Sequence, residues 1–101
     1  MRINVKTSED KSVISLNGRF DFKAHRDFRE SYEATIAAPG VRKLEVDMGA
    51  VDYLDSSALG MLLMLRERAQ AAKKDIALTN CRGTVKQILD IANFQTLFAV
   101  R

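Results

Sequence analysis

The stretch LEVDMGAVDYLDSSALGMLLMLRERA, residues 44–69, decides the fold because its hydrophobic pattern changes along its length. Apolar and acidic residues alternate in LEVDM, as they do on a strand with one buried face. From Ala58 to Leu65 the side chains are almost all apolar, and charges return at Arg66. We therefore expect a strand, a loop GAVDYLD and a helix, in the order that begins a strand–helix–strand unit.

The residues before this unit predict a hairpin followed by an amphipathic helix. Apolar residues alternate with polar ones around Ile3 and Val5, TSEDKS at residues 7–12 is typical of a turn, and β-branched residues return over 13–16. The sequence APG at residues 38–40 ends the helix. The apolar residues of this predicted helix are spaced by three or four residues, or by sums of these steps: Phe22, Phe28, Tyr32 and Ile36.

The residues after the unit predict a further strand, a helix and a last short strand. The strands are expected at residues 76–78 and in TLFAV at residues 96–100, and Asn93 is a plausible helix stop. The helix between them has apolar residues at helical spacing: Val85, Ile88, Leu89 and Ala92. Alternating strands and helices favour a parallel sheet with right-handed crossovers, and the first hairpin makes it mixed. We predict an α/β fold with a mixed sheet of about five strands flanked by helices.

Composition narrows the classes of function. The chain has 101 residues, which suits one domain, and 16 Lys and Arg against 13 Asp and Glu. The cations are interspersed with acids, so no basic stripe for nucleic acid is visible. Cys81 is the only cysteine, which excludes an intrachain disulfide. The apolar run at residues 58–65 is far shorter than the roughly 20 residues of a membrane-spanning helix, and no signal peptide is visible. We expect a cytoplasmic protein with no membrane or nucleic-acid partner.

Asp55, Ser56 and Ser57 are the residues before the apolar run that carry chemistry. Aspartate and serine at this place accept hydrogen bonds from the first N–H groups of a helix, so capping is the commonest reason for them. A regulatory phosphate is a further possibility, because a helix N-terminus carries partial positive charge and tolerates an anion. Phosphorylation would add about −1.5 to −2 charge beside Asp55.

A catalytic serine is the least supported of the three readings. The single histidine, His25, lies on another predicted helix, so Ser56 has no evident base. Leu54 also stands where the first glycine of a G-x-S-x-G nucleophile elbow would be. With one histidine and one cysteine, a metal site is equally unsupported. We therefore expect no enzymatic activity, no metal and no cofactor.

The apolar residues after the serines cover more of a helix circumference than one core-facing stripe requires. They are Leu59, Met61, Leu62, Leu63, Met64 and Leu65. Either part of this helix contacts a partner, or neighbouring elements bury all of it. Both readings stay open from the residues alone, because methionine serves as a gap-filler and as an adaptable contact residue.

Three segments together carry a resemblance to a known family: LNGRFD at residues 16–21, YLDSSALG at residues 53–60 and VKQILDIANFQTLF at residues 85–98. With these segments the chain resembles the STAS domain family, specifically the bacterial anti-sigma factor antagonists. The resemblance covers nearly the whole chain, so residues 1–101 are expected to form one STAS domain. Two departures are Ala58, where a glycine is more frequent, and Phe20, where many relatives have an aliphatic residue.

The resemblance implies roles for single residues. Ser56 takes the position of the phosphorylated hydroxyl, and Ser57 that of a neighbouring hydroxyl that caps the helix or shapes the loop. Asp55 takes the position of the acidic residue before the phosphosite, Asp21 that of an acidic residue near the partner surface, and Gly18 that of a turn glycine. The partner-binding residues expected on this basis are Asp21, Asp55, Ser57, Ala58, Leu59 and Met61.

The function implied by the resemblance is partner switching. The unphosphorylated domain would bind an anti-sigma factor that is often an ATP-dependent serine kinase, phosphorylation of Ser56 would release it, and a PP2C-type phosphatase would restore binding. The alternative is a STAS-like structural subunit of a transport or lipid-handling complex. In that case the same helix is a permanent interface and Ser56 is only a cap.

Overall fold

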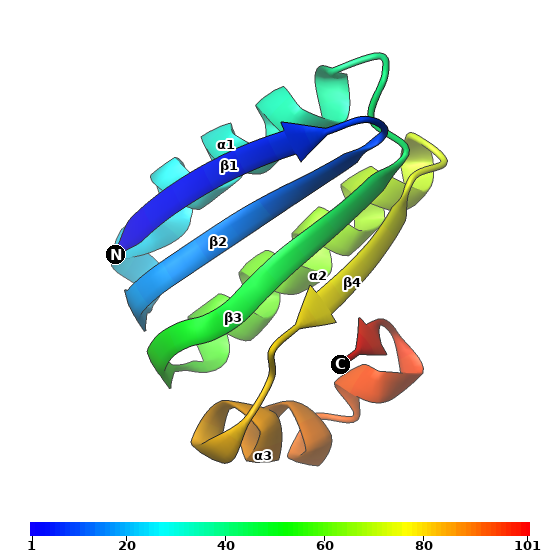
Figure 1. Ribbon diagram of the computed structural model, residues 1–101. Coiled ribbons are helices and arrows are strands. Elements are labelled where there is room, and N and C mark those ends of the chain that lie inside the picture. The colour runs from blue at the N-terminus through cyan, green and yellow to red at the C-terminus, as the bar shows by residue number, and fades with distance from the viewer.

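The computed structural model describes all residues, 1–101, as one mixed sheet with helices packed against it (Figure 1). The chain begins with two strands and then alternates between helices and strands. In chain order the elements are β1 (Arg2–Ser8), β2 (Lys11–Phe20), η1 (Phe22–Ala24), α1 (His25–Ala37), β3 (Lys43–Leu54), α2 (Ser56–Ala71), β4 (Asp75–Thr79), α3 (Gly83–Ile91), η2 (Phe94–Thr96) and β5 (Ala99–Val100).

The five strands lie in the order β1-β2-β3-β4-β5, so each strand pairs with its neighbour in sequence. β1 and β2 form the predicted antiparallel hairpin, and the remaining pairs are parallel. The turn of the hairpin is tight, with Glu9 in the left-handed region at a φ of 58°. The predicted fold class, an α/β fold with a mixed five-stranded sheet, is confirmed.

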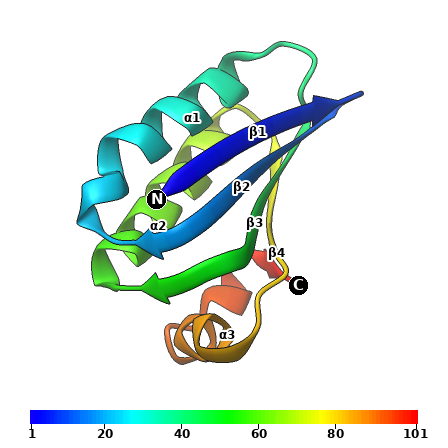
Figure 2. The same cartoon turned by 60° about the vertical axis from the view of Figure 1, so that its left-hand side comes forward.

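The two faces of the sheet differ in chemistry because side chains alternate along each strand. One row across four strands is apolar and consists of Val5, Ile14, Val46 and Leu78. The adjacent row, one residue away on the opposite face, is polar and consists of Asn4, Ser15, Asp47 and Thr79. α1 and α2 cover the apolar face, and α3 lies below β3 and β4 in Figure 1 and contacts β3 (Figures 1 and 2).

Aromatic side chains pack between α1 and the sheet. Phe28 has no exposed surface and makes edge-to-face contacts with Phe20 and Tyr32, with ring centroids 5.1 and 5.3 Å apart. Such pairs contribute about 0.5–1.5 kcal/mol beyond the apolar area that they bury. Burial, with a smaller contribution from the neighbouring Glu33 carboxylate, raises the pKa of Tyr32. Phe20, the departure from the aliphatic residue common in relatives, is therefore a core residue.

α2 is less completely buried than a helix in the centre of a core. Ala58, Met61, Leu62, Leu65 and Ala69 face the sheet and α1. Leu63 and Met64 lie on the outer side of the helix and are partly exposed. Part of the apolar run therefore faces outward, as one of the two readings of the sequence requires. No helix is both long enough and apolar enough to cross a membrane.

Four details of the sequence prediction are wrong. β3 continues to Leu54 instead of ending in a loop at Gly49, because residues 50–54 still pair with β2. Gly18 lies within β2 and not in a turn: its φ of 104° accompanies a shift of register against β3, a conformation that glycine adopts without strain. Phe22 lies on η1 with its side chain exposed, so it is not part of the buried stripe of α1. The last strand is also shorter than predicted and consists of Ala99–Val100.

Candidate functional site

The predicted site lies where β2 and β3 end side by side. Arg19 pairs with Tyr53 and Phe20 with Leu54, so the two strands reach the same edge of the sheet together. An aspartate follows each strand and begins a helical segment: Asp21 precedes η1 and Asp55 precedes α2. The parallel register thus brings together two acidic residues that are 34 positions apart in sequence.

Asp55 is the residue that caps α2. Its backbone is extended, with φ −117° and ψ −177°, and its side-chain Oδ1 accepts a hydrogen bond from the N–H of Ala58 at 3.0 Å. The carbonyl of Asp55 accepts the N–H of Leu59 at 3.2 Å. The first bond satisfies one of the N–H groups that a helix start leaves without partners, and the second is the first backbone bond of the helix itself.

Ser56 and Ser57 occupy the first two positions of α2, and both are exposed. Neither hydroxyl makes a hydrogen bond within the protein, because the cap is supplied by the residue before them. The predicted capping role of Ser57 is therefore wrong. The Ser56 hydroxyl is accessible at the positive end of a helix of 16 residues.

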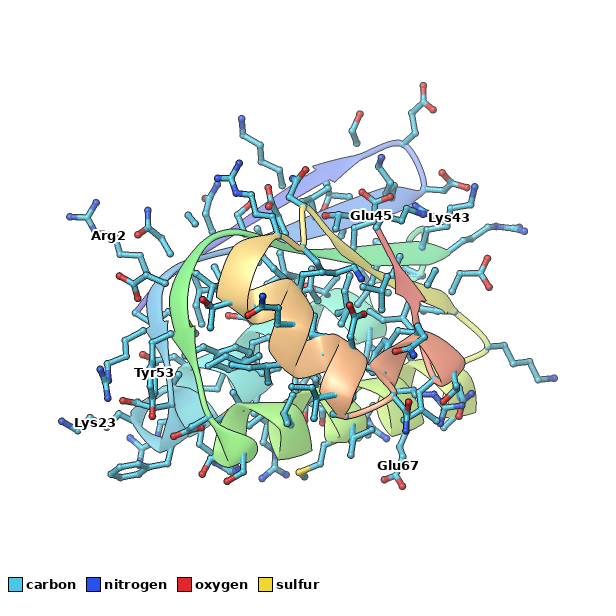
Figure 3. The ribbon with its side chains drawn as sticks, turned by 90° about the horizontal axis from the view of Figure 1, so that it is seen from below. Arg2, Lys23, Lys43, Glu45, Tyr53 and Glu67 are labelled. Carbon is cyan, nitrogen blue, oxygen red and sulfur yellow. The ribbon has the colours of Figure 1, made fainter.

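Asp21 organises the neighbouring turn in the same manner. Its Oδ1 accepts the N–H of Lys23 at 3.0 Å, and its Oδ2 pairs with Nε of Arg19 at 3.1 Å. The guanidinium of Arg19 also lies over the ring of Tyr53, 3.8 Å from its centroid. Figure 3 shows Tyr53 and Lys23 on the same side of the molecule. Arg19 thus links the end of β2 to the end of β3.

Two of the predicted partner-binding residues are not at the surface. The side chain of Ala58 is 0% exposed and that of Met61 is 5% exposed, and both pack in the core. The prediction that these side chains contact a partner is wrong, because the helix directs them towards the sheet. Leu59 is partly buried, so some of its surface remains accessible.

Phe22 is an apolar side chain at this edge that the sequence reasoning misplaced. It is 65% exposed, directly after Asp21, and Tyr53 nearby is also exposed. One feature of the sequence indicates this position: Phe22 lies between Asp21 and the polar segment KAHRD, before the helical spacing of buried apolar residues begins. We call Asp21, Phe22, Tyr53, Asp55 and Ser56 the strand-end surface.

The single histidine and the single cysteine are not part of the strand-end surface. His25 is exposed at the start of α1, and no group of three or more His, Cys, Asp or Glu residues has the geometry of a metal site. Cys81 is partly buried after β4, and its thiol lies 3.8 Å from the carbonyl oxygen of Thr79. Burial is the main cause that raises the pKa of Cys81 to about 11, so the thiol is protonated at neutral pH.

Comparison with known proteins identifies relatives of this chain. A family model described as "Mlab, STAS domain" matches residues 3–99. The chain is 49% identical to a STAS-domain containing protein of Pseudomonas aeruginosa over 88 residues, which are 87% of this chain and 85% of the relative. It is 27% identical over 74 residues to BtrV of Bordetella bronchiseptica, named as a candidate anti-sigma factor antagonist, with 70% of this chain and 64% of the relative covered.

Solved structures share the fold at lower identity. The anti-sigma factor antagonist SpoIIAA of Bacillus, in its unphosphorylated form, is 20% identical, with a TM-score of 0.77 over 99% of this chain and 87% of that chain. Its phosphorylated form has a TM-score of 0.76 at 18% identity, over 99% of this chain and 91% of that chain. A sulfate transporter family protein of Wolinella succinogenes has a TM-score of 0.79 at 14% identity, over 94% and 79%. These likenesses concern the fold.

Proposed function

The chain belongs to the STAS domain family, and from this premise we propose that it is an anti-sigma factor antagonist whose partner binding is controlled by phosphorylation of Ser56. The observation that carries the proposal is the free, exposed hydroxyl of Ser56 at the start of α2, beside a cap that Asp55 supplies. The 27% identity to BtrV supports the assignment to this functional class.

The reaction at Ser56 is a phosphoryl transfer that the partner catalyses. The Ser56 oxygen forms a bond to the γ-phosphorus of ATP, the bond to ADP breaks, and the hydroxyl proton leaves to a base of the kinase. A PP2C-type phosphatase reverses the change by hydrolysis, with water attacking phosphorus and inorganic phosphate leaving. The chain itself supplies an accessible acceptor and no catalytic group.

The free domain is able to carry the phosphate without losing its fold. Helix N-termini stabilise anions through the helix dipole and through N–H groups that have no partner within the helix. Because Asp55 rather than Ser56 forms the cap, modification of the Ser56 hydroxyl leaves the bond to the Ala58 N–H in place. The effect of phosphorylation is thus expected in the complex and not in the stability of the domain.

Phosphorylation is expected to weaken the complex strongly, because the surface around Ser56 loses its water when the partner binds. A phosphate of about −1.5 to −2 charge joins the carboxylates of Asp55 and Asp21 at the same edge. Leaving such a charge buried without a cation costs several kcal/mol, against about 8 kcal/mol for a micromolar complex. One modification is therefore sufficient to release the partner.

The partner contacts that we propose are those of the strand-end surface, with Ser57 and the accessible part of Leu59. Phe22 is the apolar anchor of this surface, because it is exposed, aromatic residues are enriched in interfaces, and a few well-packed side chains carry most of the binding energy there. The side chains of Ala58 and Met61 are buried in the core beneath α2 and make no contact with the partner.

A binding experiment with two variants tests the proposal. The Ser56→Ala and Ser56→Asp proteins are used to capture partners, and the ATP-binding regulator recovered is then purified and titrated with each. We expect Ser56→Ala to bind as wild type does and Ser56→Asp to bind at least tenfold more weakly, with unchanged circular dichroism. Thr84→Asp serves as the matched control, because it adds the same carboxylate at the exposed start of another helix, α3, outside the proposed contacts, and it is expected to bind as wild type does. Equal affinity of the Ser56→Ala and Ser56→Asp proteins would contradict the switch.

A second candidate function is a structural subunit of a transport or lipid-handling complex. The observation that favours it is the exposed pair Leu63 and Met64 on the outer side of α2, which suits a permanent interface. In this case the partner is a membrane transport protein that the Ser56→Ala and Ser56→Asp proteins recover equally. Substitution of Met64 by Lys would then abolish recovery, whereas the strand-end surface would be dispensable.

A further inference from the structure

A groove with a volume of about 770 Å³ lies on the polar face of the sheet, away from α1 and α2. Its floor is formed by β2 and β3 and includes Ser15, Asn17 and Asp47. One wall is β1, with Arg2 and Asn4, and the other is the segment after β4, with Asn80 and Arg82. The groove is distinct from the strand-end surface, because it shares no residue with it.

The wall after β4 is fixed to the floor by a small hydrogen-bond network. Oδ1 of Asp47 accepts from the N–H of Gly49 at 2.9 Å and from Nδ2 of Asn80 at 3.0 Å. Nη2 of Arg82 donates to the carbonyl of Gly49 at 2.9 Å. Gly49 permits this close approach, since a Cβ there would lie 3.1 Å from Oδ1 of Asp47 and 3.2 Å from Cβ of Asn80. The side chains of this wall are therefore held in place before any ligand arrives.

The opposite side of the groove carries polar groups that have no partner in the protein. Register places Asn4 beside Ser15 and Arg2 beside Asn17, so the four side chains form two cross-strand pairs on one face. No side-chain hydrogen bond joins any of them to another residue of the protein. Figure 3 shows Arg2 far from Lys43 and Glu45, which lie towards the other end of the strands.

The charges of the lining select an anionic ligand. Arg2 and Arg82 contribute two guanidinium groups against the single carboxylate of Asp47, which already accepts two hydrogen bonds. Guanidinium groups match the geometry of phosphate and carboxylate oxygens. The amides of Asn4, Asn17 and Asn80 offer both donors and acceptors, as hydroxyl groups require. We infer that this groove binds a small polyhydroxylated oxyanion, such as a sugar phosphate or a sugar acid.

Titrations monitored by amide chemical shifts of the ¹⁵N-labelled protein test this inference. Glucose 6-phosphate and glucuronate are the two charged probes. Glucose is the control without the charged group, and inorganic phosphate is the control without the sugar. We expect saturable shifts confined to β1, the middle of β2 and residues 47–50 and 80–82, with at least one charged probe binding tenfold more tightly than both counterparts. Absence of saturable shifts with both charged probes, or equal affinity for glucose or phosphate, would overturn the inference.

Variants assign the binding to the groove. Arg2→Gln and Arg82→Gln are each expected to weaken binding of the charged sugar at least tenfold. Lys6→Gln is the matched control, because it removes the same charge from the same face of β1 outside the groove, and it is expected to bind within twofold of wild type. Wild-type affinity in both arginine variants would overturn the assignment. Arg2 makes no internal contact through its side-chain nitrogens, so Arg2→Gln remains informative if Arg82→Gln disturbs the loop.

Discussion

The carboxylate of Asp55 accepts the backbone N–H of Ala58 at 3.0 Å, across the two serines that lie between them. This relationship separates the structural task of Asp55 from the regulatory role that we propose for Ser56. The aspartate closes the helix start, so the hydroxyl of Ser56 keeps no structural role that phosphorylation would disturb. A helix cap and an exposed hydroxyl thus lie on adjacent residues.

Asp55→Ala removes the cap and lowers the free energy of unfolding by about 1 kcal/mol, within the usual range of about 0.5–2 kcal/mol for an N-cap residue. Urea unfolding followed by circular dichroism measures the change. Asp52→Ala is the control, because Asp52 is an exposed acidic residue of β3 without a capping bond. Equal losses in the two variants would show that Asp55 acts only through its charge.

Leu62 and Leu63 form a matched pair that tests which side of α2 is buried. Leu62 has no exposed surface, so Leu62→Ala leaves a cavity and destabilises the protein by about 2–5 kcal/mol. Leu63 is partly exposed, so Leu63→Ala costs less than about 1 kcal/mol. Thermal and urea unfolding of both variants give the comparison, and a reversed order would contradict the orientation of the helix.

Phe22→Ala weakens the complex with the regulatory partner at least tenfold, which corresponds to about 1.4 kcal/mol, and leaves stability unchanged. The reason is that Phe22 is exposed at the strand-end surface and packs little within the domain. Ile91→Ala is the control, since Ile91 is 82% exposed on α3 outside this surface. Calorimetric titration distinguishes them, and equal affinities would remove Phe22 from the interface.

Cys81 gives a prediction about pH. Burial raises the pKa of the folded thiol from 9.0 to about 11, so at pH 8 the folded protein holds about a hundredfold less thiolate than the unfolded chain. Alkylation by iodoacetamide is expected to be at least that much slower in the folded protein than in urea. Because the folded thiol keeps its proton while the unfolded thiol loses it, the stability present below about pH 9 declines as pH rises towards 11. The decline is expected to be smaller in Cys81→Ala, where the part due to the raised pKa of Tyr32 remains, and a decline as large as in wild type would assign it to other groups.

The order of elements could be predicted because each has its own hydrophobic period, from the alternation in LEVDM to the helical spacing of Phe28, Tyr32 and Ile36. The end of β3 could not, because Asp52 and Tyr53 are exposed on a strand that only its pairing with β2 maintains. Serine and aspartate both cap helices, so the residue types alone did not identify which residue caps α2. The extended backbone of Asp55 in the structure identifies it.

The groove could not be predicted because it depends on register. Asn4, Ser15 and Asp47 are unremarkable polar residues of three strands, and only the pairing of those strands places them in one row. Asn80 and Arg82 join them through a loop whose position depends on its hydrogen bonds to Asp47 and Gly49. Phe22 was missed for a related reason, because a turn of 3₁₀-helix precedes α1 and rotates that side chain outward.

The measurement that tests the central claim most directly is the intact mass of the protein after incubation with its purified kinase partner and ATP. We predict that the wild-type protein and Ser57→Ala each gain the mass of one phosphoryl group and that Ser56→Ala gains none. A wild-type protein without added phosphate, or a Ser56→Ala protein that still acquires it, would contradict the assignment of Ser56 as the switch.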